Sequence, residues 1–390
     1  MIRNALGGAL CCLMLLSGCT GARKAMEAPR FSPSELHPGD ILKTRPLEKV
    51  SFDALMEDLS KARVVYAGET HLSIEDHEVQ QRILEALCDI HPSPVLALEM
   101  IPREMQPVLD RWSAGELDEA AFLKAVKWHR TWGYPFRLYR DLLETARDKE
   151  LKVLALNAPR QVVRKIARQG LSSLDEGERG RMAREMDMAH ASHRKKSRSQ
   201  FQKHVRGDIK DFEAFYQAQL AWEETMAETL ARALEADPSG SPVLVLLGRG
   251  HMEYGWGVPR RTESRFPHVW RTVAPLPASV WAEGPDAAMS DYVWLTRGDR
   301  FVHPGRGRVG IVLKALEKGE GVEILGVFPG SPAHEAGLMK GDVISRIDDI
   351  PVESLDDLHE AMSSPKDPPE YWFHIRREGV MKTLPVTLED

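Results

Sequence analysis

The chain has 390 residues, of which 43% are apolar, and its formal net charge is −6. This length accommodates two or three domains, and the apolar fraction is that of a globular protein. The negative charge balance gives no reason to expect nucleic acid as a partner.

The first residues form a targeting segment. Arg3 precedes an apolar run, Ala9–Leu16, which is too short to span a membrane as a mature helix. The run leads into Ser17-Gly18-Cys19, and the whole resembles the bacterial lipoprotein signal. The resemblance implies a signal peptide over residues 1–19, lipidation of Cys19 and a lipid anchor in the cell envelope, with Thr20 favouring the outer membrane. An ordinary secretory signal with a chance cysteine is the alternative.

Residues 20–47 contain four prolines and little periodicity, which predicts a flexible tether between the lipid and the first domain. After loss of the signal, Cys88 is the one cysteine left besides the lipidated residue, so no intramolecular disulfide is expected.

Four short apolar runs end on a polar group, and helical patterns separate them. The runs, with the polar residues that follow, are Val64–Ala67 with Glu69 and His71, Val95–Leu98 with Glu99, Val153–Leu156 with Asn157, and Val243–Leu247 with His251. Alternating strand and helix patterns predict an α/β domain with a mostly parallel sheet. Ligands bind at the carboxyl ends of strands in such sheets, so these polar residues are predicted to converge on one rim.

Helical sequence between Pro159 and Asp237 exceeds one crossover and predicts a helical cap over that rim. Within it, His190 and His193 lie one helical turn apart among many basic residues. They could ligate a metal or haem iron, or form a solvated helix face.

Two loops are candidates for the wall of a pocket. Residues 129–135, which include Arg130, are aromatic and punctuated by Gly and Pro; surface packing is the alternative. Residues 252–261 carry Tyr254, Arg260 and Arg261 directly after the last rim histidine. Two glycines and one proline predict that this second loop has no regular helix, and it is the better pocket candidate.

Residues 301–390 predict a second, small and β-rich domain. The order SPAHEAGL, KGDVI and SRIDDIPV closely resembles bacterial PDZ domains. Such domains bind chain ends or extended segments by strand addition. The resemblance places Val309, Gly310 and Ile311 in the loop that receives a peptide carboxylate, with a peptide or protein C-terminus as partner. A PDZ fold used only for docking or dimerisation is the alternative.

The upstream segments GETH, ALEM, WGYP, ALNAPR, QLAWEETMA and GRGHMEYGWGVPRR resemble the ChaN family of haem-binding lipoproteins. This family lies in the Tiki/erythromycin-esterase-like superfamily. The resemblance covers about residues 50–273 and implies an α/β domain over residues 48–297 with a role in haem or iron uptake at the cell surface. A homodimer is left open. In the wider superfamily, paired Gly-x-x-His turns with an acidic residue are associated with metal-dependent hydrolysis.

Two functions follow from these features, and a scaffold whose rim residues are structural is the third reading. For haem, the candidate axial or distal groups are Tyr254, His71 and His251, and the candidate propionate partners are Arg130, Arg260 and Arg261. For hydrolysis, the residues that would hold a divalent ion such as Zn, Mn or Co are His71, His251, Glu69 and Glu99. A carboxylate left over would then act as general base on bound water.

Overall fold

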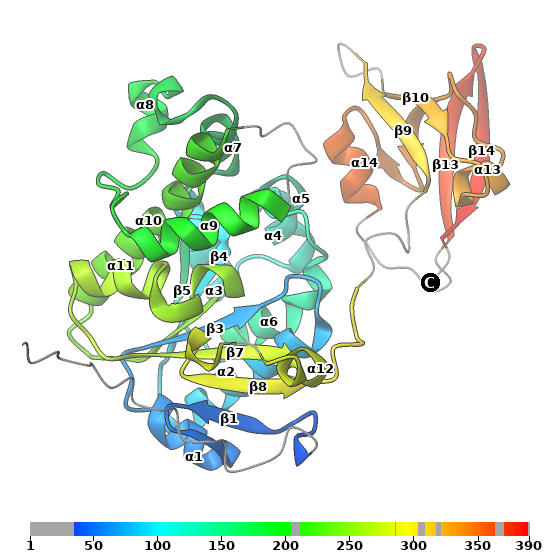
Figure 1. Ribbon diagram of the computed structural model, residues 1–390. Coiled ribbons are helices and arrows are strands. Elements are labelled where there is room, and N and C mark those ends of the chain that lie inside the picture. The colour runs from blue at the N-terminus through cyan, green and yellow to red at the C-terminus, as the bar shows by residue number, and fades with distance from the viewer. Residues whose placement is uncertain are drawn as a thin grey trace, which may run out of the picture.

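The structure is a computed structural model of the 390-residue chain, shown as a ribbon in Figure 1. It describes residues 35–203, 211–284, 286–302, 309–316, 321–362 and 370–388. The predicted signal peptide, Cys19 and most of the predicted tether lie outside the described residues. Two sheets are present, one in each of the two predicted domains.

The first sheet has eight strands in the order β2-β1-β8-β7-β3-β6-β4-β5. Their bounds are β1 (Ile41–Thr44), β2 (Leu47–Val50), β3 (Val64–Glu69), β4 (Val95–Pro102), β5 (Val153–Asn157), β6 (Val243–Gly248), β7 (Trp270–Pro277) and β8 (Tyr292–Thr296). From β8 to β5 every neighbouring pair is parallel, and the two antiparallel pairs are β8 with β1 and β1 with β2. The predicted α/β fold with a mostly parallel sheet is confirmed.

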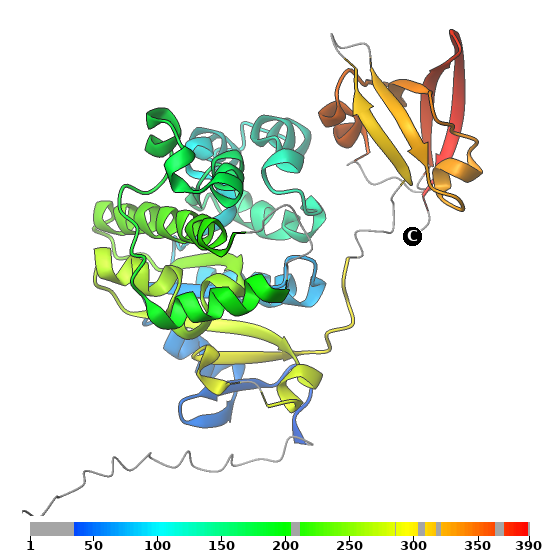
Figure 2. The ribbon, with the colours of Figure 1, turned by 45° about the horizontal axis from the view of Figure 1, so that its top comes forward.

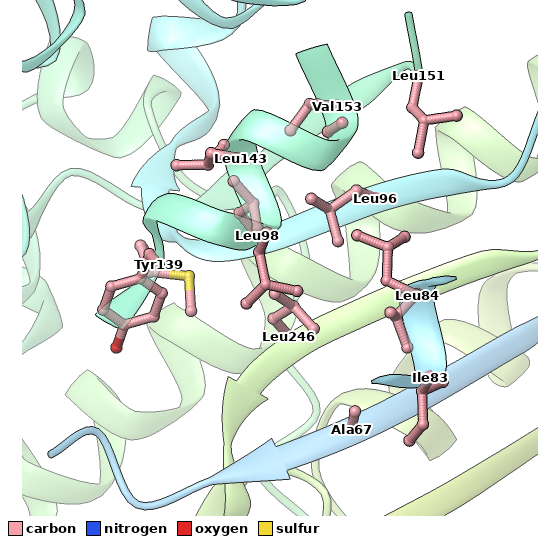
Figure 3. Packing of buried hydrophobic residues seen from close by; sticks show 14 of the residues in the cluster. Ala67, Ile83, Leu84, Leu96, Leu98, Tyr139, Leu143, Leu151, Val153 and Leu246 are labelled. Carbon is pink, nitrogen blue, oxygen red and sulfur yellow. The ribbon is translucent and has the colours of Figure 1, made fainter. Parts of the chain in front are cut away.

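Both faces of this sheet are buried, which explains why its strands are continuous apolar runs. Successive side chains of a strand point to opposite faces. Accordingly, Val65 and Ala67 of β3 belong to one hydrophobic cluster, while Val64 and Tyr66 belong to the other. Figure 3 shows part of the first cluster, where Leu96 and other strand residues pack beside helix α2.

Helices form a layer on each face. The first face is covered by α1 (Phe52–Leu59), α2 (Ile74–Ile90), α3 (Gln106–Ser113), α4 (Glu119–Val126), α5 (Trp128–Thr131) and α6 (Arg140–Asp148). The second face carries α7 (Arg160–Gln169), α8 (Glu176–Gly180), α9 (Ala191–Lys203), α10 (Phe212–Ala236), α11 (Val258–Arg265) and α12 (Ala278–Ala282). In Figure 2 the long helix α10 and helix α9 lie on the same side of the sheet, and the two helices contact each other. No helix within the described residues is both long and apolar enough to cross a bilayer.

Local sequence sets where α2 begins, directly after the first Gly-x-x-His turn. Ser73 has an extended backbone, and its hydroxyl accepts a hydrogen bond from the Asp76 amide, as an N-cap should. Glu75 and Asp76 lie in the first turn, where carboxylates interact favourably with the helix dipole. Val79, Ile83 and Leu87 then bury one face of the helix, so the turn is held between strand and helix.

Two local predictions differ from the structure. The tether was predicted to extend through residue 47, but Ile41–Thr44 already pairs with β8. Four residues beside prolines are too short a pattern to reveal a strand that is fixed by its partner. The glycine-rich loop was predicted to be irregular through residue 261, but α11 begins at Val258. Pro259 lies in its first turn, where the missing N–H is not needed.

The C-terminal domain is an antiparallel sheet with its own hydrophobic core, as predicted. Its elements are β9 (Ile311–Ala315), β10 (Val322–Val327), α13 (Pro332–Glu335), β11 (Val343–Ile347), β12 (Ile350–Pro351), α14 (Leu355–Ala361), β13 (Glu370–Arg377) and β14 (Val380–Thr387). The main path runs β14-β13-β11-β10-β9, so β9 is an edge strand of the described sheet, and α14 lies beside it.

Candidate functional site

The carboxyl ends of β3, β6, β4 and β5 lie side by side, because these four strands are parallel neighbours. Glu69 ends β3, Glu99 lies in β4, Asn157 ends β5, and the short 3-10 helix η5 (Arg249–His251) follows β6. The residues predicted to converge on one rim are therefore brought together. Asn157 has a structural part in the rim, since its side-chain amide donates to the backbone carbonyl of Glu99.

A buried carboxylate orients His71. Its Nδ1 lies 2.9 Å from Oε1 of Glu69, which also accepts the Tyr139 hydroxyl at 2.7 Å. The other oxygen, Oε2, accepts from the Gln80 amide at 3.0 Å. Burial alone would raise the pKa of Glu69, but the His77 and His71 imidazoles and the Tyr139 hydroxyl outweigh burial and lower the pKa to about 2. Glu69 is therefore a fixed anion that holds the His71 ring.

A second buried carboxylate orients His251. Its Nδ1 lies 3.2 Å from Oε1 of Glu223, and its Nε2 lies 3.4 Å from Oε1 of Glu99. Glu223 also contacts Nε2 of His193 at 2.9 Å and Nε of Arg261 at 3.2 Å. Burial raises the pKa of Glu223, but these imidazoles outweigh it and leave the pKa well below its ordinary value. Both ring nitrogens of His251 are thus engaged by carboxylates.

Gly248 allows the His71 ring to approach Glu99. A Cβ atom at this glycine would lie 2.9 Å from Cε1 and 3.3 Å from Nε2 of His71. The Gly248 amide donates to Oε2 of Glu99, which ties β6 to β4 at the same point. The His71 ring therefore packs directly on Gly248, and a side chain at this position would overlap the ring.

The first aromatic loop packs against His71. The ring of His71 lies 4.8 Å from the ring of Trp132 and 4.7 Å from that of Tyr134, measured between centroids. The loop therefore packs on the turn that carries His71, and its role as the wall of a pocket stays a prediction. Arg130, from the same segment, is exposed.

The second loop builds a separate surface, which we call the aromatic platform and define as His190, Tyr254 and Trp256. The rings of Tyr254 and Trp256 stack 4.4 Å apart at 21°, and His190 lies 5.8 Å from Trp256. Tyr254 has a left-handed backbone with φ of 62°. Such strain costs on the order of 1–3 kcal/mol in a non-glycine residue and is concentrated at functional sites.

A cavity of about 240 Å³ lies next to the platform, between α9, α10 and η5. Lys196 of α9, Gln219 and Glu223 of α10, and His251 line it. Lys196 also lies over the Tyr254 ring, with Nζ 5.8 Å from the centroid, so the cavity and the platform are adjacent.

The family described as haem-binding uptake, Tiki superfamily, ChaN matches residues 55–262, just over half of the chain. The chain belongs to this ChaN family. The PDZ domain family matches residues 307–388, so the C-terminal domain is a PDZ domain fused to a ChaN domain.

Individual relatives of the ChaN domain are distant. A structure described as cofacial heme binding to ChaN of Campylobacter jejuni has 20% identity and a TM-score of 0.53, covering 66% of this chain and 97% of that chain. At that identity the likeness shows the fold alone. Protein RETICULATA-RELATED 5, chloroplastic, from Arabidopsis thaliana is 25% identical over 258 residues, which is 61% of this chain. The match spans about a third, 34%, of that relative's length.

The arginines predicted to bind propionates have different surroundings. Arg260 of the ChaN domain is exposed, with no side-chain partner among the described residues. Arg261 is 4% exposed and is bonded to both Glu223 and Glu224. Its guanidinium holds α11 against α10, so the structure does not offer it to an external anion.

Both histidines of the predicted cap also have hydrogen-bond partners. His193 uses Nε2 on Glu223, and its Nδ1 lies 3.4 Å from the Tyr216 hydroxyl. His190 accepts the His193 amide on Nδ1 and so caps α9, which leaves its proton on Nε2. Within the described ranges, no group of three or more His, Cys, Asp or Glu side chains is arranged to hold a metal ion.

Sequence reasoning did not identify Glu223, although it connects His193, His251 and Arg261. The available signal was its position in a long helix where both neighbours along the apolar face, Leu220 and Ala227, are buried. A carboxylate at such a position must be paired, because an unpaired buried charge is very costly.

The loop of the PDZ domain predicted to bind a carboxylate packs on β10 and α13. Val309 is buried and its carbonyl accepts the Ala333 amide, while the Gly310 carbonyl accepts the Phe328 amide. Gly310 has φ of 80°, and a Cβ there would overlap Ser331, so this turn requires glycine. Ile311 then starts the edge strand β9.

Proposed function

We propose that the ChaN domain binds haem at the aromatic platform and delivers it for iron uptake. The observation that carries this proposal is the phenol of Tyr254. Its hydroxyl has no hydrogen-bond partner among the described residues, and its ring is half-buried against Trp256. Tyrosine is one of the residues that ligate haem iron, and an aromatic stack suits the flat face of a porphyrin.

The other predicted axial groups fit haem less well. His251 has both ring nitrogens engaged by carboxylates. The His71 ring packs so closely on Gly248 that a methyl group there would overlap it. The neighbouring cavity, at about 240 Å³, is smaller than the roughly 300–1,000 Å³ of pockets for drug-sized ligands. These observations support a porphyrin on the platform and not at His71 or His251.

Hemin titration of the full chain tests the proposal. A saturable shift of the Soret band is expected, with a stoichiometry fixed per chain. A purely linear rise in absorbance up to a large excess of hemin would overturn haem binding.

The alternative function, a metal-dependent hydrolase built on Glu69, His71, Glu99 and His251, has less support. Two imidazoles facing a carboxylate suit proton transfer. However, both ring nitrogens of His251 already lie near carboxylates, and the described residues present no group of three His, Cys, Asp or Glu side chains arranged to hold a metal ion. These residues do not fit a divalent ion in their present arrangement, so no step through a metal is derived.

We further propose that the chain is anchored to the cell envelope through lipid on Cys19, with the outer membrane as its location. The signal-like sequence supports this proposal. A Cys19→Ala variant expressed in the native host is expected to move from the membrane fraction to the soluble fraction of the envelope, while Cys88→Ala stays with the membrane. Equal membrane association of both variants would contradict lipid anchoring at Cys19.

The PDZ domain is proposed to bind the C-terminus of a peptide or protein partner along β9. An edge strand beside a helix supports this, since strand addition uses free backbone groups. Replacing Leu313 of β9 with proline is expected to abolish binding in a screen of C-terminal peptides, because proline fixes φ and removes a backbone donor. The matched Leu384→Pro change lies on the opposite edge strand, β14. Equal loss of binding with both variants would indicate unfolding and not a groove on β9.

A further inference from the structure

Lys196 connects the aromatic platform to the cavity beneath α9. Its ammonium lies 5.8 Å from the centroid of the Tyr254 ring, and the same side chain lines the cavity. Only 15% of the Lys196 side chain is exposed, so its charge is held in place and partly shielded from water. A ligand seated on the platform therefore lies next to a fixed cation.

The cavity has hydrogen-bond donors that no described residue satisfies. An ammonium group has three N–H donors. Two of those of Lys196 point to the Gly250 carbonyl and to Oε2 of Glu253, each at 2.8 Å. One donor is left. Gln219 also lines the cavity, and its side-chain amide has no partner among the described residues.

The cavity has no free anion to match these donors. Within the described lining, Glu223 is the sole carboxylate, and it is already bonded to His193, His251 and Arg261. Polar groups in a confined space are costly when unpaired, so spare donors favour an incoming acceptor. A carboxylate is the chemical class that accepts from an ammonium and an amide at once.

Size decides which part of a ligand enters. A cavity of about 240 Å³ admits a short carboxylate arm but not a macrocycle. Arg261, which the sequence suggested for this task, is buried on the far side of Glu223 in the ion-pair network.

We propose that Lys196 and Gln219 receive one carboxylate of the bound porphyrin inside this cavity. The inference rests on haem binding at the aromatic platform. The exposed guanidinium of Arg260 is free to meet the second carboxylate outside it. A small free carboxylate is the other source of the same chemistry, and experiment separates the two.

The test compares hemin with its dimethyl ester, which lacks both carboxylates, on the full chain. Lys196→Met is expected to weaken hemin binding about tenfold, the equivalent of one charge-assisted hydrogen bond. It is expected to leave binding of the ester unchanged. Lys195→Met is the matched control, because Lys195 is exposed, adjacent in sequence and absent from the cavity lining. Gln219→Leu provides a second variant, which retains the contacts of Lys196 and is expected to weaken hemin binding selectively.

Several outcomes would overturn the inference. Equal hemin affinity in the Lys196→Met and Lys195→Met chains would do so, as would equal weakening of hemin and ester by Lys196→Met. If propionate alone binds with dependence on Lys196 while hemin does not depend on it, the occupant is a free carboxylate. If the hemin band is lost on mutation of Tyr254 but unchanged on mutation of Lys196 or Gln219, this inference is overturned and the proposal of haem binding stands. Absence of any saturable hemin band in the unmodified chain overturns both proposals.

Discussion

Replacing Tyr254 with phenylalanine is expected to weaken hemin binding by at least about a hundredfold and to remove the visible bands of a tyrosine-ligated haem. Mutating a residue that only hydrogen-bonds to a metal ligand typically lowers metal affinity about 10- to 100-fold. Loss of the iron ligand itself is therefore expected to lower affinity by at least the upper value. Phenylalanine retains the stack on Trp256 and removes only the hydroxyl. Absorption titration and the spectrum of the ferric complex measure the result.

Tyr134→Phe is the control for this change. Tyr134 is also half-buried, and it lies against His71 on the other candidate surface. Full hemin affinity is expected in the control. Retained affinity and spectrum in the Tyr254 variant, with loss in the Tyr134 variant, would instead locate haem beside His71.

Replacing Glu223 with leucine is expected to lower the free energy of unfolding of the ChaN domain by about 3–5 kcal/mol, the usual cost of breaking a buried ion pair on one side. The change leaves His193, His251 and the Nε of Arg261 without their shared anion. Urea unfolding, monitored by tryptophan fluorescence, measures the free energy of unfolding of the ChaN domain, because eight of the nine tryptophans precede the PDZ domain. Trp372 is the exception.

Glu235→Leu is the matched control, since Glu235 is exposed near the end of the same helix and is expected to change stability by less than about 0.5 kcal/mol. The pH dependence gives a second check. Because the folded pKa of Glu223 is lowered, its stabilisation is present above the ordinary value of 4.5 and is lost as the pH falls below it. The stability difference between the chains should therefore narrow in acid. A difference that is constant with pH would show that lost packing, and not lost charge, causes the effect.

The sequence allowed the strands and their shared rim to be predicted, because runs such as Val243–Leu247 are buried on both faces and turn residues follow them directly. Strand β1 was missed, since only its pairing with β8 makes four residues a strand. The helix α11 was missed because proline and glycine were read as breakers, whereas proline is tolerated in a first turn.

The site was predicted only in part, because the sequence does not reveal side-chain orientation or contacts between residues far apart in the chain. The positions of Glu69, His71, Glu99 and His251 followed from the strand order. The strand order did not predict whether a neighbouring arginine points into the domain or toward solvent. Arg260 is exposed, whereas Arg261 is buried. Glu223 reaches the rim from a helix on the second face, and nothing in a local pattern reveals such a long-range contact.

The pairing of β1 with β8 has a mechanical consequence. Ile41 lies opposite Trp294 and Lys43 opposite Tyr292, so the chain before β1 and the chain after β8 leave the sheet from the same end. A pull applied between those two segments would unzip this pair one rung at a time, starting at its outer end. Beyond β8 the chain also bonds to the turn that carries His71, since the Val302 amide donates to the Leu72 carbonyl and the Ile74 amide donates to the Arg300 carbonyl. The same pull would therefore load that turn as well as the margin of the sheet.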